Sequence, residues 1–220
     1  MSADSGIKTF RDEDGLWEGH DIKQVATPQA WEKDKSLVLD FYNERRKQAQ
    51  QVEPNAGHLA LSELEQEFKV SIITQNVDNL HERAGSSNVI HLHGELAKVR
   101  SENAPSLIYN IGGQTIEVGD TAEDGGQLRP HVVWFGEPVP QMKKATAIVP
   151  NADILIVIGT SLVVYPAAGL TDLAPKAIPK YVIDPVKPQQ MDYSRWEHIQ
   201  QTAEKGTPEL VEELLAEQYN

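Results

Sequence analysis

The chain contains no cysteine. This absence excludes disulfide bonds and every metal site built from thiolates. Positive charge is also scarce, because 20 lysines and arginines stand against 33 aspartates and glutamates, for a net charge of −13. An acidic protein binds nucleic acids and anionic membranes poorly, so we expect neither as a partner. Lysine-bearing segments of other proteins fit this charge, although a high net charge also serves solubility alone.

Long hydrophobic runs are missing as well. The longest apolar stretch, Ile154–Ile158, has the length of a strand and is far shorter than the roughly 20 residues that a membrane helix needs. No signal-peptide pattern is present. We therefore expect a cytoplasmic protein that does not associate with membranes.

The apolar residues that are present favour an α/β fold. Near-continuous β-branched runs, typical of strands buried on both faces, lie at Val70–Thr74, Val132–Phe135, Ile154–Ile158 and Tyr181–Ile183. Helical spacing of apolar residues marks Asp34–Gln51, Pro54–Phe68 and Pro208–Ala216, the last with Thr207 as the expected N-cap. The alternation of strands and helices predicts a doubly wound parallel, Rossmann-like sheet.

One region departs from this alternation. Residues 98–128 are rich in Gly, Asn, Ser and Asp, and Gly112-Gly113 separates two short alternating pieces, Leu107–Ile111 and Thr115–Val118. This pattern predicts a hairpin. We therefore expect a small β module at 98–128, inserted into a Rossmann-like domain formed by residues 1–97 and 129–220.

Polar side chains follow the first predicted strand. The segment Thr74–His81 carries carboxamides and a carboxylate, which suit ribose hydroxyls and a neutral amide. A polar turn with an Asx cap before the next helix explains the same residues equally well.

Two alternating histidines, His91 and His93, precede Gly94. In an extended segment both side chains point to the same side, and the glycine allows a ligand to approach the backbone closely. A histidine serves as a general base near neutral pH, whereas a hydrogen-bonded structural histidine is the commoner case.

A third cluster, Gly159-Thr160-Ser161, follows the strongest strand. A glycine and two hydroxyls at a carboxyl end suit a phosphate or a ribose. Turn residues look the same, so this cluster is weak evidence by itself.

Together, in order and with their flanks, these segments resemble the successive motifs of the sirtuin family. The motifs are Ser5–Arg11, Thr74–Asp78, His91–Gly94, Arg129–Glu137 and Gly159–Ala168. The resemblance spans nearly the whole chain. It implies an NAD-dependent enzyme that removes acyl groups from protein lysines and gives nicotinamide and an acylated ADP-ribose.

The resemblance also implies roles for single residues. His93 is the expected general base, Asn76 the residue that holds the nicotinamide ribose and a water, Asp78 the contact to the nicotinamide amide, and Gln75 a ribose contact. The remaining cofactor contacts implied are Phe10 and Arg11 on a mobile loop, Gly159, Thr160, Ser161, Asp184 and Ala203.

Substrate contacts follow in the same way. Phe135, Gly136 and Glu137 on one side, with Val163 and Val164 on the other, are expected to hold the substrate backbone as an added strand. Tyr42 and Arg45 resemble the Tyr-x-x-Arg pair of the desuccinylase branch, and Ala3 its small pocket residue. Residues at i and i+3 share a helix face, so this pair can converge on one carboxylate. The alternative is that Tyr42 packs and Arg45 pairs with acids at the surface.

The sequence departs from the family at two places. The inserted module of sirtuins holds zinc through two Cys-x-x-Cys pairs, whereas Ser101 stands near the first thiolate position, so we expect no metal. The family also begins with a strand ending in Gly-Ala-Gly, and this chain begins after that point. We expect the natural protein to carry this strand, beside Val70–Thr74 and Ile154–Ile158.

We therefore expect a zinc-free desuccinylase that acts as a monomer on acyl-lysine proteins with NAD. The alternatives are a general deacetylase and a catalytically impaired protein that binds NAD or ADP-ribose.

Overall fold

The computed structural model describes residues 1–7, 16–17, 20–188 and 193–217. Its elements, in chain order, are η1 (Ser2–Ser5), β1 (Leu16–Trp17), β2 (His20–Asp21), α1 (Ile22–Val25), α2 (Pro28–Lys33), α3 (Lys35–Gln51), α4 (Ala56–Leu64), β3 (Ile72–Thr74), α5 (Leu80–Arg83), β4 (Val89–His91), β5 (Gly94–Ser101), β6 (Ile108–Asn110), β7 (Leu128–Val132), α6 (Met142–Ile148), η2 (Val149–Asn151), β8 (Leu155–Ile158), η3 (Ala167–Leu173), β9 (Lys180–Ile183), η4 (Tyr193–Arg195), β10 (Glu197–Ile199) and α7 (Ala203–Glu217).

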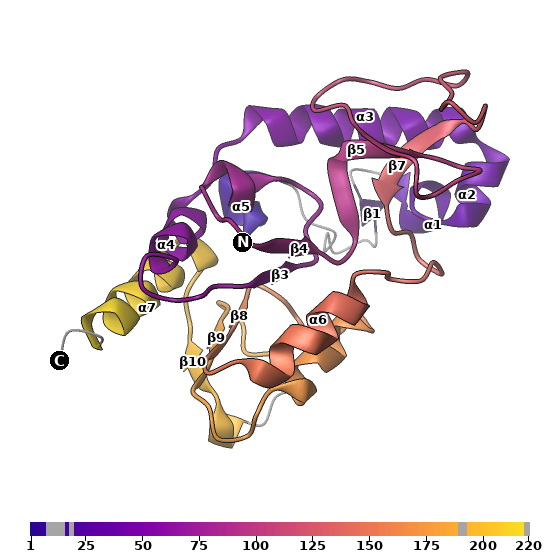
Figure 1. The fold of residues 1–220 in the computed structure, drawn as a ribbon. Coiled ribbons are helices and arrows are strands. Elements are labelled where there is room, and N and C mark those ends of the chain that lie inside the picture. The colour runs from indigo at the N-terminus through magenta and orange to yellow at the C-terminus, as the bar shows by residue number, and fades with distance from the viewer. Residues whose placement is uncertain (8–15, 18–19, 189–192, 218–220) are drawn as a thin grey trace.

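Parallel strands form the centre of the molecule. Strand β3 pairs with β4, and β8, β9 and β10 pair in the order β10-β9-β8, all in parallel. Helices α4 and α7 lie side by side on one face, and α6 lies against the other (Figure 1). The predicted doubly wound α/β fold is therefore confirmed.

The side chains of β8 and β9 explain this layering. Ile156, Ile158 and Ile183 pack in the apolar cluster of α4 and α7, whereas Val157 and Val182 pack with Leu162 and Ala168 on the other face. Because side chains of a strand alternate between faces, both faces of this sheet are buried. This is why the continuous β-branched runs could be recognised in the sequence.

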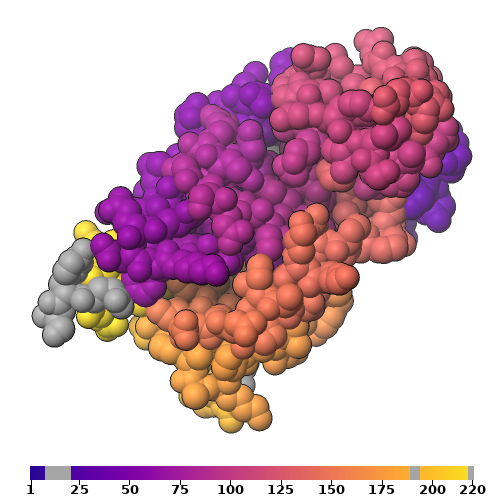
Figure 2. All heavy atoms as spheres, in the orientation of Figure 1, coloured from indigo at the N-terminus to yellow at the C-terminus, as the bar shows by residue number. Residues whose placement is uncertain are grey.

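The parallel sheet is divided, which differs from the single sheet that we predicted. Among the described strands, β3 and β8 have no hydrogen-bonded pairing with each other, so β3-β4 and β8-β9-β10 are separate. In Figure 2 the segments up to about residue 130 form one side of the molecule, and the segments from about 135 to 200 form the other. Residues of both sheets, including Ile72, Ile73 and Ile156, line one cavity between them.

Local signals set the ends of the helices. The Asp34 carboxylate accepts a hydrogen bond from Leu37 N (2.9 Å) at the start of α3, as the predicted helix from Asp34 requires. Asn55 and His58 form a reciprocal capping box at the start of α4. The expected Thr207 cap is wrong, because α7 already begins at Ala203 and contains Pro208. Thr207 instead lies buried within α7, with 1% of its surface exposed.

A second, antiparallel sheet has the order β6-β5-β7. The predicted hairpin around Gly112-Gly113 is wrong, because β6 pairs with β5 and residues 115–118 form no strand. The predicted strand Val132–Phe135 is also wrong. Strand β7 ends at Val132, and the Glu137 carboxylate accepts a hydrogen bond from the Trp134 backbone N–H (2.8 Å). Strands β5 and β7 cross the limits 98 and 128, and the division into two domains there stays a prediction.

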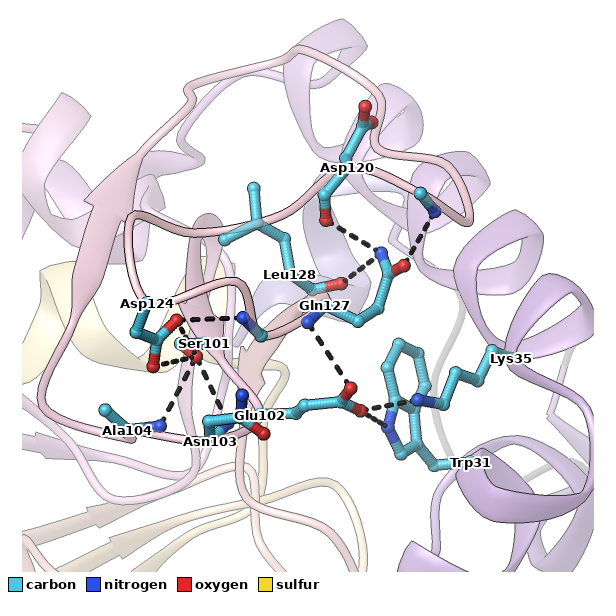
Figure 3. Close-up of polar contacts among 12 residues, drawn as sticks. Trp31, Lys35, Ser101, Glu102, Asn103, Ala104, Asp120, Asp124, Gln127 and Leu128 are labelled. Atoms are coloured by element: carbon cyan, nitrogen blue, oxygen red, sulfur yellow. Dashed lines mark hydrogen bonds and ion pairs between the residues drawn. The ribbon is translucent and has the colours of Figure 1, made fainter.

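Polar contacts fasten the loop between β6 and β7 (Figure 3). The Ser101 hydroxyl lies 2.8 Å from both carboxylate oxygens of Asp124 and accepts from the amide of Asn103. The Gln127 amide nitrogen lies within 3.1 Å of three backbone oxygens, those of Glu117, Asp120 and Leu128.

The same loop is tied to the helices. Glu102 accepts from Gln127 N with one oxygen, and from Lys35 Nζ (2.6 Å) and Trp31 Nε1 (3.0 Å) with the other (Figure 3). Hydrogen bonds and an ion pair therefore fasten this region to α2 and α3.

Within the described residues, no group of three or more His, Asp or Glu side chains has an arrangement that could hold a metal ion.

None of the helices in the described ranges is long and apolar enough to cross a membrane.

Candidate functional site

The carboxyl ends of β3 and β8 meet. The Gln75 side-chain amide, which follows β3, lies 3.4 Å from the Thr160 hydroxyl, which follows β8. Both residues line a cavity of about 1500 Å³ that also extends between the two parallel sheets. The structure thus brings together two polar clusters that are far apart in the sequence, at the edge where parallel sheets bind ligands.

His93 lies in this cavity, and its surroundings fix its tautomer. Its Nδ1 atom lies 3.2 Å from the backbone oxygen of Gln75. A carbonyl oxygen only accepts, so Nδ1 carries the proton and Nε2 keeps its lone pair. Burial lowers the pKa of His93, which favours the neutral ring. His93 therefore has the tautomer and the charge of a general base.

His91 has a different environment. Its Nδ1 atom lies 2.9 Å from the Asn76 backbone oxygen, and its Nε2 atom lies 2.8 Å from a carboxylate oxygen of Glu82. Burial lowers the pKa of His91, but the Glu82 and Asn76 contacts outweigh it and raise this pKa above its usual value. Both nitrogens are engaged, so His91 orients the segment around Asn76 and has no lone pair for a substrate.

Asn76 and Asp78 both line the cavity. The Asn76 side-chain amide donates to the Ser2 hydroxyl (2.8 Å), a contact that the sequence did not reveal because the two residues are 74 positions apart. One Asp78 oxygen accepts from Leu80 N (3.2 Å), so the alternative of an Asx cap is partly correct. Asp78 retains a second carboxylate oxygen for a ligand.

The other predicted cofactor residues lie along the same cavity. Gly159, Thr160, Ser161, Asp184 and Ala203 all line it. Gly159 has a φ of +59°, and a Cβ atom there would lie 2.7 Å from the Met1 nitrogen, so glycine is required. Asp184 is 7% exposed and accepts from Val186 N (2.9 Å) with one oxygen. Phe10 and Arg11 lie outside the described residues.

Gly94 has a positive φ of +81° because of its own chain. A Cβ atom at this position would collide with the backbone oxygen of His131 on β7. The close approach that we expected from a ligand is therefore made by a neighbouring strand.

Tyr42 and Arg45 lie one turn apart on α3 and line the cavity that contains His93. Tyr42 is 1% exposed and packs in the hydrophobic core, as the alternative expected, whereas Arg45 is 5% exposed and so does not lie at the surface. Arg45 lies 3.4 Å from the Gln48 side-chain oxygen, and its charge acts on the Tyr42 hydroxyl. Ala3 is exposed and lines the same cavity.

The predicted substrate segments flank the cavity. Phe135 is 46% exposed and is followed in the chain by Gly136. Val163 is 57% exposed and is followed by Val164. The Glu137 side chain is bound to Arg129 (2.7 Å) and Arg100 (3.3 Å). Its carboxylate therefore holds the loop in place, and only its backbone remains for a substrate.

The comparisons with known proteins agree with this geometry. Residues 1–166 match the Sir2 family. An NAD-dependent protein deacylase of Bacteroides thetaiotaomicron is 53% identical over 97% of this chain and 92% of its own length. An NAD-dependent protein deacylase of Helicobacter pylori is 59% identical over 84% of this chain and 80% of its own. The crystal structure of a Sir2 homolog–NAD complex superposes with a TM-score of 0.87 at 37% identity, covering 98% of this chain and 86% of that one. The resemblance to sirtuins is confirmed, and the chain belongs to the Sir2 family.

Proposed function

We propose that this protein is an NAD-dependent protein-lysine deacylase that prefers the acidic acyl groups succinyl and malonyl and also removes acetyl. Its products are nicotinamide and O-acyl-ADP-ribose. NAD-dependent deacylation is the activity of its Sir2-family relatives. One observation supports the acidic preference, namely that a buried guanidinium and a buried phenol share the cavity of His93.

The residues present suit NAD. Two carboxamides, Gln75 and Asn76, and two buried carboxylates, Asp78 and Asp184, offer the donors and acceptors that ribose hydroxyls and the nicotinamide amide require. Gly159, Thr160 and Ser161 follow β8 where a doubly wound sheet accommodates the adenosine part. We assign Ala203 to the adenine side, and Phe10 and Arg11 stay predicted contacts. When bound, NAD supplies the ribose carbon at which the acyl oxygen displaces nicotinamide.

His93 acts as the general base in this proposal. Its Nε2 lone pair takes a proton from a ribose hydroxyl, and Nδ1–H stays on the Gln75 carbonyl throughout. That hydrogen bond keeps the ring in one orientation and stabilises the imidazolium that forms. Asn76 holds the nicotinamide ribose beside it. Its own orientation depends on Ser2 through the side chain and on His91 through the backbone.

Tyr42 and Arg45 select the acyl group. A guanidinium bound to a carboxylate in a desolvated pocket gains more than one in water, because the dielectric constant there is low. The phenol stays protonated, because burial raises the Tyr42 pKa. It can therefore donate to the same carboxylate. Ala3 leaves space at the pocket.

The substrate is an acyl-lysine segment of another protein. Its backbone binds between Phe135–Glu137 and Val163–Val164 as an added strand, which reads the main chain more than the sequence. The charge of −13 favours basic segments and disfavours nucleic acids and anionic membranes. We propose that the protein works as a monomer in the cytoplasm.

The test is the release of nicotinamide from NAD with matched succinyl-, malonyl- and acetyl-lysine peptides. Wild-type protein is expected to have the highest kcat/KM on the acidic groups. Arg45→Met should lower succinyl turnover about 10- to 150-fold and change acetyl turnover little. Equal losses on both substrates would contradict the acyl preference. Absence of NAD-dependent turnover on every peptide would leave a protein that only binds NAD or ADP-ribose.

A further inference from the structure

Trp134 contacts Tyr42, one of the two residues that are proposed to bind the acyl group. It follows β7, is 2% exposed, and lines the same cavity as Tyr42. Its indole Nε1 lies 3.0 Å from the Tyr42 hydroxyl oxygen, and the two rings are tilted with centroids 6.4 Å apart. None of the roles proposed above uses this residue.

Two groups hold the Trp134 ring in place, and a third contact holds its backbone. The Arg129 guanidinium lies over it, 3.4 Å from the ring centroid, and is itself bound to the Glu137 carboxylate (2.7 Å). The same carboxylate accepts from the Trp134 amide (2.8 Å). The other neighbour is Trp31, with ring centroids 5.7 Å apart. The Trp31 N–H is in turn bound to Glu102 in the polar network of Figure 3. Trp134 is thus locked between two fixed groups.

The hydrogen bond between Trp134 and Tyr42 has a defined donor and a defined acceptor. An indole N–H can only donate, so the Tyr42 oxygen must be the acceptor. The hydroxyl proton then has to point to a different acceptor than Trp134. A hydroxyl without this contact would be able to turn its lone pairs toward the pocket, where they would repel a carboxylate.

We propose that Trp134 is a specificity-determining positioning residue, which fixes Tyr42 as a hydrogen-bond donor toward the carboxylate of an acidic acyl group. This inference rests on the proposed function, because it requires that Tyr42 contacts such a group. In this proposal Trp134 acts on the acyl group only through Tyr42.

A substitution that keeps an aromatic ring and removes the N–H tests this role, and a matched control allows for the packing that is lost with the indole. Trp134→Phe is expected to raise KM for a succinyl-lysine peptide about 3- to 10-fold, the range of one neutral hydrogen bond, with kcat and acetyl-lysine kinetics nearly unchanged. Trp31→Phe is the matched control. It removes an indole N–H from the adjacent ring, which binds Glu102 and not Tyr42, so the ratio of succinyl to acetyl kcat/KM should stay that of wild type. An isosteric replacement of Trp134 by benzothienylalanine, which lacks only the N–H, repeats the test if phenylalanine prevents folding.

A double-mutant cycle with Tyr42→Phe completes the experiment. In that background Trp134→Phe should have no further effect on the succinyl-to-acetyl ratio, since the hydroxyl that it orients is gone. The proposal is overturned if Trp134→Phe lowers both activities equally, if it leaves the ratio unchanged, or if Trp31→Phe changes the ratio as much. Failure of the proposed function is a separate result. Wild-type protein would then show no preference for succinyl-lysine over acetyl-lysine, and this inference would fall with it.

Discussion

The Nδ1 atom of His93 lies 3.2 Å from the carbonyl oxygen of Gln75 and takes the only hydrogen-bonding role open to it there, that of donor. His91, two residues earlier, has acceptors at both nitrogens. The two histidines alternate on one segment, as the sequence indicated, yet only His93 keeps a lone pair for chemistry. This difference leads to the first prediction.

His93→Tyr should lower the deacylation rate by at least about 10²-fold, the usual loss when a general base is removed. NAD binding should persist, because the proposed ribose and adenine contacts come from other residues. Rates on an acyl-lysine peptide and NAD affinity by calorimetry are the measurements. The control is His91→Gln, which should lower NAD affinity or Tm more than it lowers the rate of the chemical step. Near-normal turnover of the His93 variant would exclude His93 as the base.

Much of this site followed from the sequence because its signals are local. The β-branched run Ile154–Ile158 gives β8, and the polar residues after it come to the cavity simply because a strand ends there. Pairings over long distances were not accessible. The contact between Tyr42 and Trp134 joins residues 92 positions apart, and the one between Asn76 and Ser2 joins residues 74 apart. No local pattern encodes either contact.

The errors have physical causes as well. The sequence of Val132–Phe135 is typical of a strand. The Trp134 backbone N–H instead donates to the Glu137 carboxylate, and the chain turns there. Strand β4 is only three residues long, too short to stand out by its composition. The division between β3 and β8 depends on which strands pair with each other in the whole fold, and no local sequence pattern determines this.

Removal of metal should have no effect on this protein. The sequence has no cysteine, and the Ser101 hydroxyl is hydrogen-bonded to Asp124. Elemental analysis of purified protein should find no stoichiometric zinc, and a chelator should leave Tm unchanged within about 1 °C, whereas loss of a structural metal would unfold the region that it holds. One equivalent of tightly bound zinc would contradict this prediction.

Gln127 should contribute strongly to stability. Its side chain binds the backbone N–H of Gly119 and the backbone oxygens of Glu117, Asp120 and Leu128. The contacts to Asp120 and Leu128 are drawn in Figure 3. Gln127→Ala leaves these groups without this partner, which should cost about 2–3 kcal/mol and lower Tm by roughly 5–10 °C. The matched control is Gln114→Ala, at an exposed position of the same region, which should change Tm by about 1 °C or less. Similar losses in both variants would contradict the role of the Gln127 network.

The last prediction concerns His58 and His81, whose rings meet edge to face with centroids 4.8 Å apart beside the cavity that His81 lines. They are 0% and 4% exposed. The His58 Nε2 and His81 Nδ1 atoms are buried and have no hydrogen-bond partner in the described part of the chain. Burial lowers the pKa of each ring from 6.5 to about 4, and the charge of His58 opposes that of His81. The folded state therefore favours the neutral form of both rings.

The sign of the pH dependence follows. Well above pH 6.5 both rings are neutral in the folded and unfolded states, so they do not change the free energy of unfolding there. Between pH 6.5 and about 4 the unfolded chain binds protons that the folded chain does not, so stability falls as the pH falls. His91, with its raised pKa, acts oppositely, but its contribution is already complete below pH 6.5 and adds no slope in this window.

His81→Leu should therefore flatten the decline of Tm between pH 6.5 and 4. Removal of one such group accounts for on the order of 2–3 kcal/mol, or roughly 5–10 °C, at the acid end. At pH 7.5 the variant should be at least as stable as wild type, because an unpaired buried nitrogen is gone. His91→Gln serves as the control and should lower Tm by a nearly constant amount between pH 6.5 and about 5, above the range in which Glu82, whose pKa His91 helps to lower, takes up protons. Thermal unfolding at half-unit pH steps makes the comparison, and parallel curves for wild type and His81→Leu would show that the buried pair does not set the acid limit.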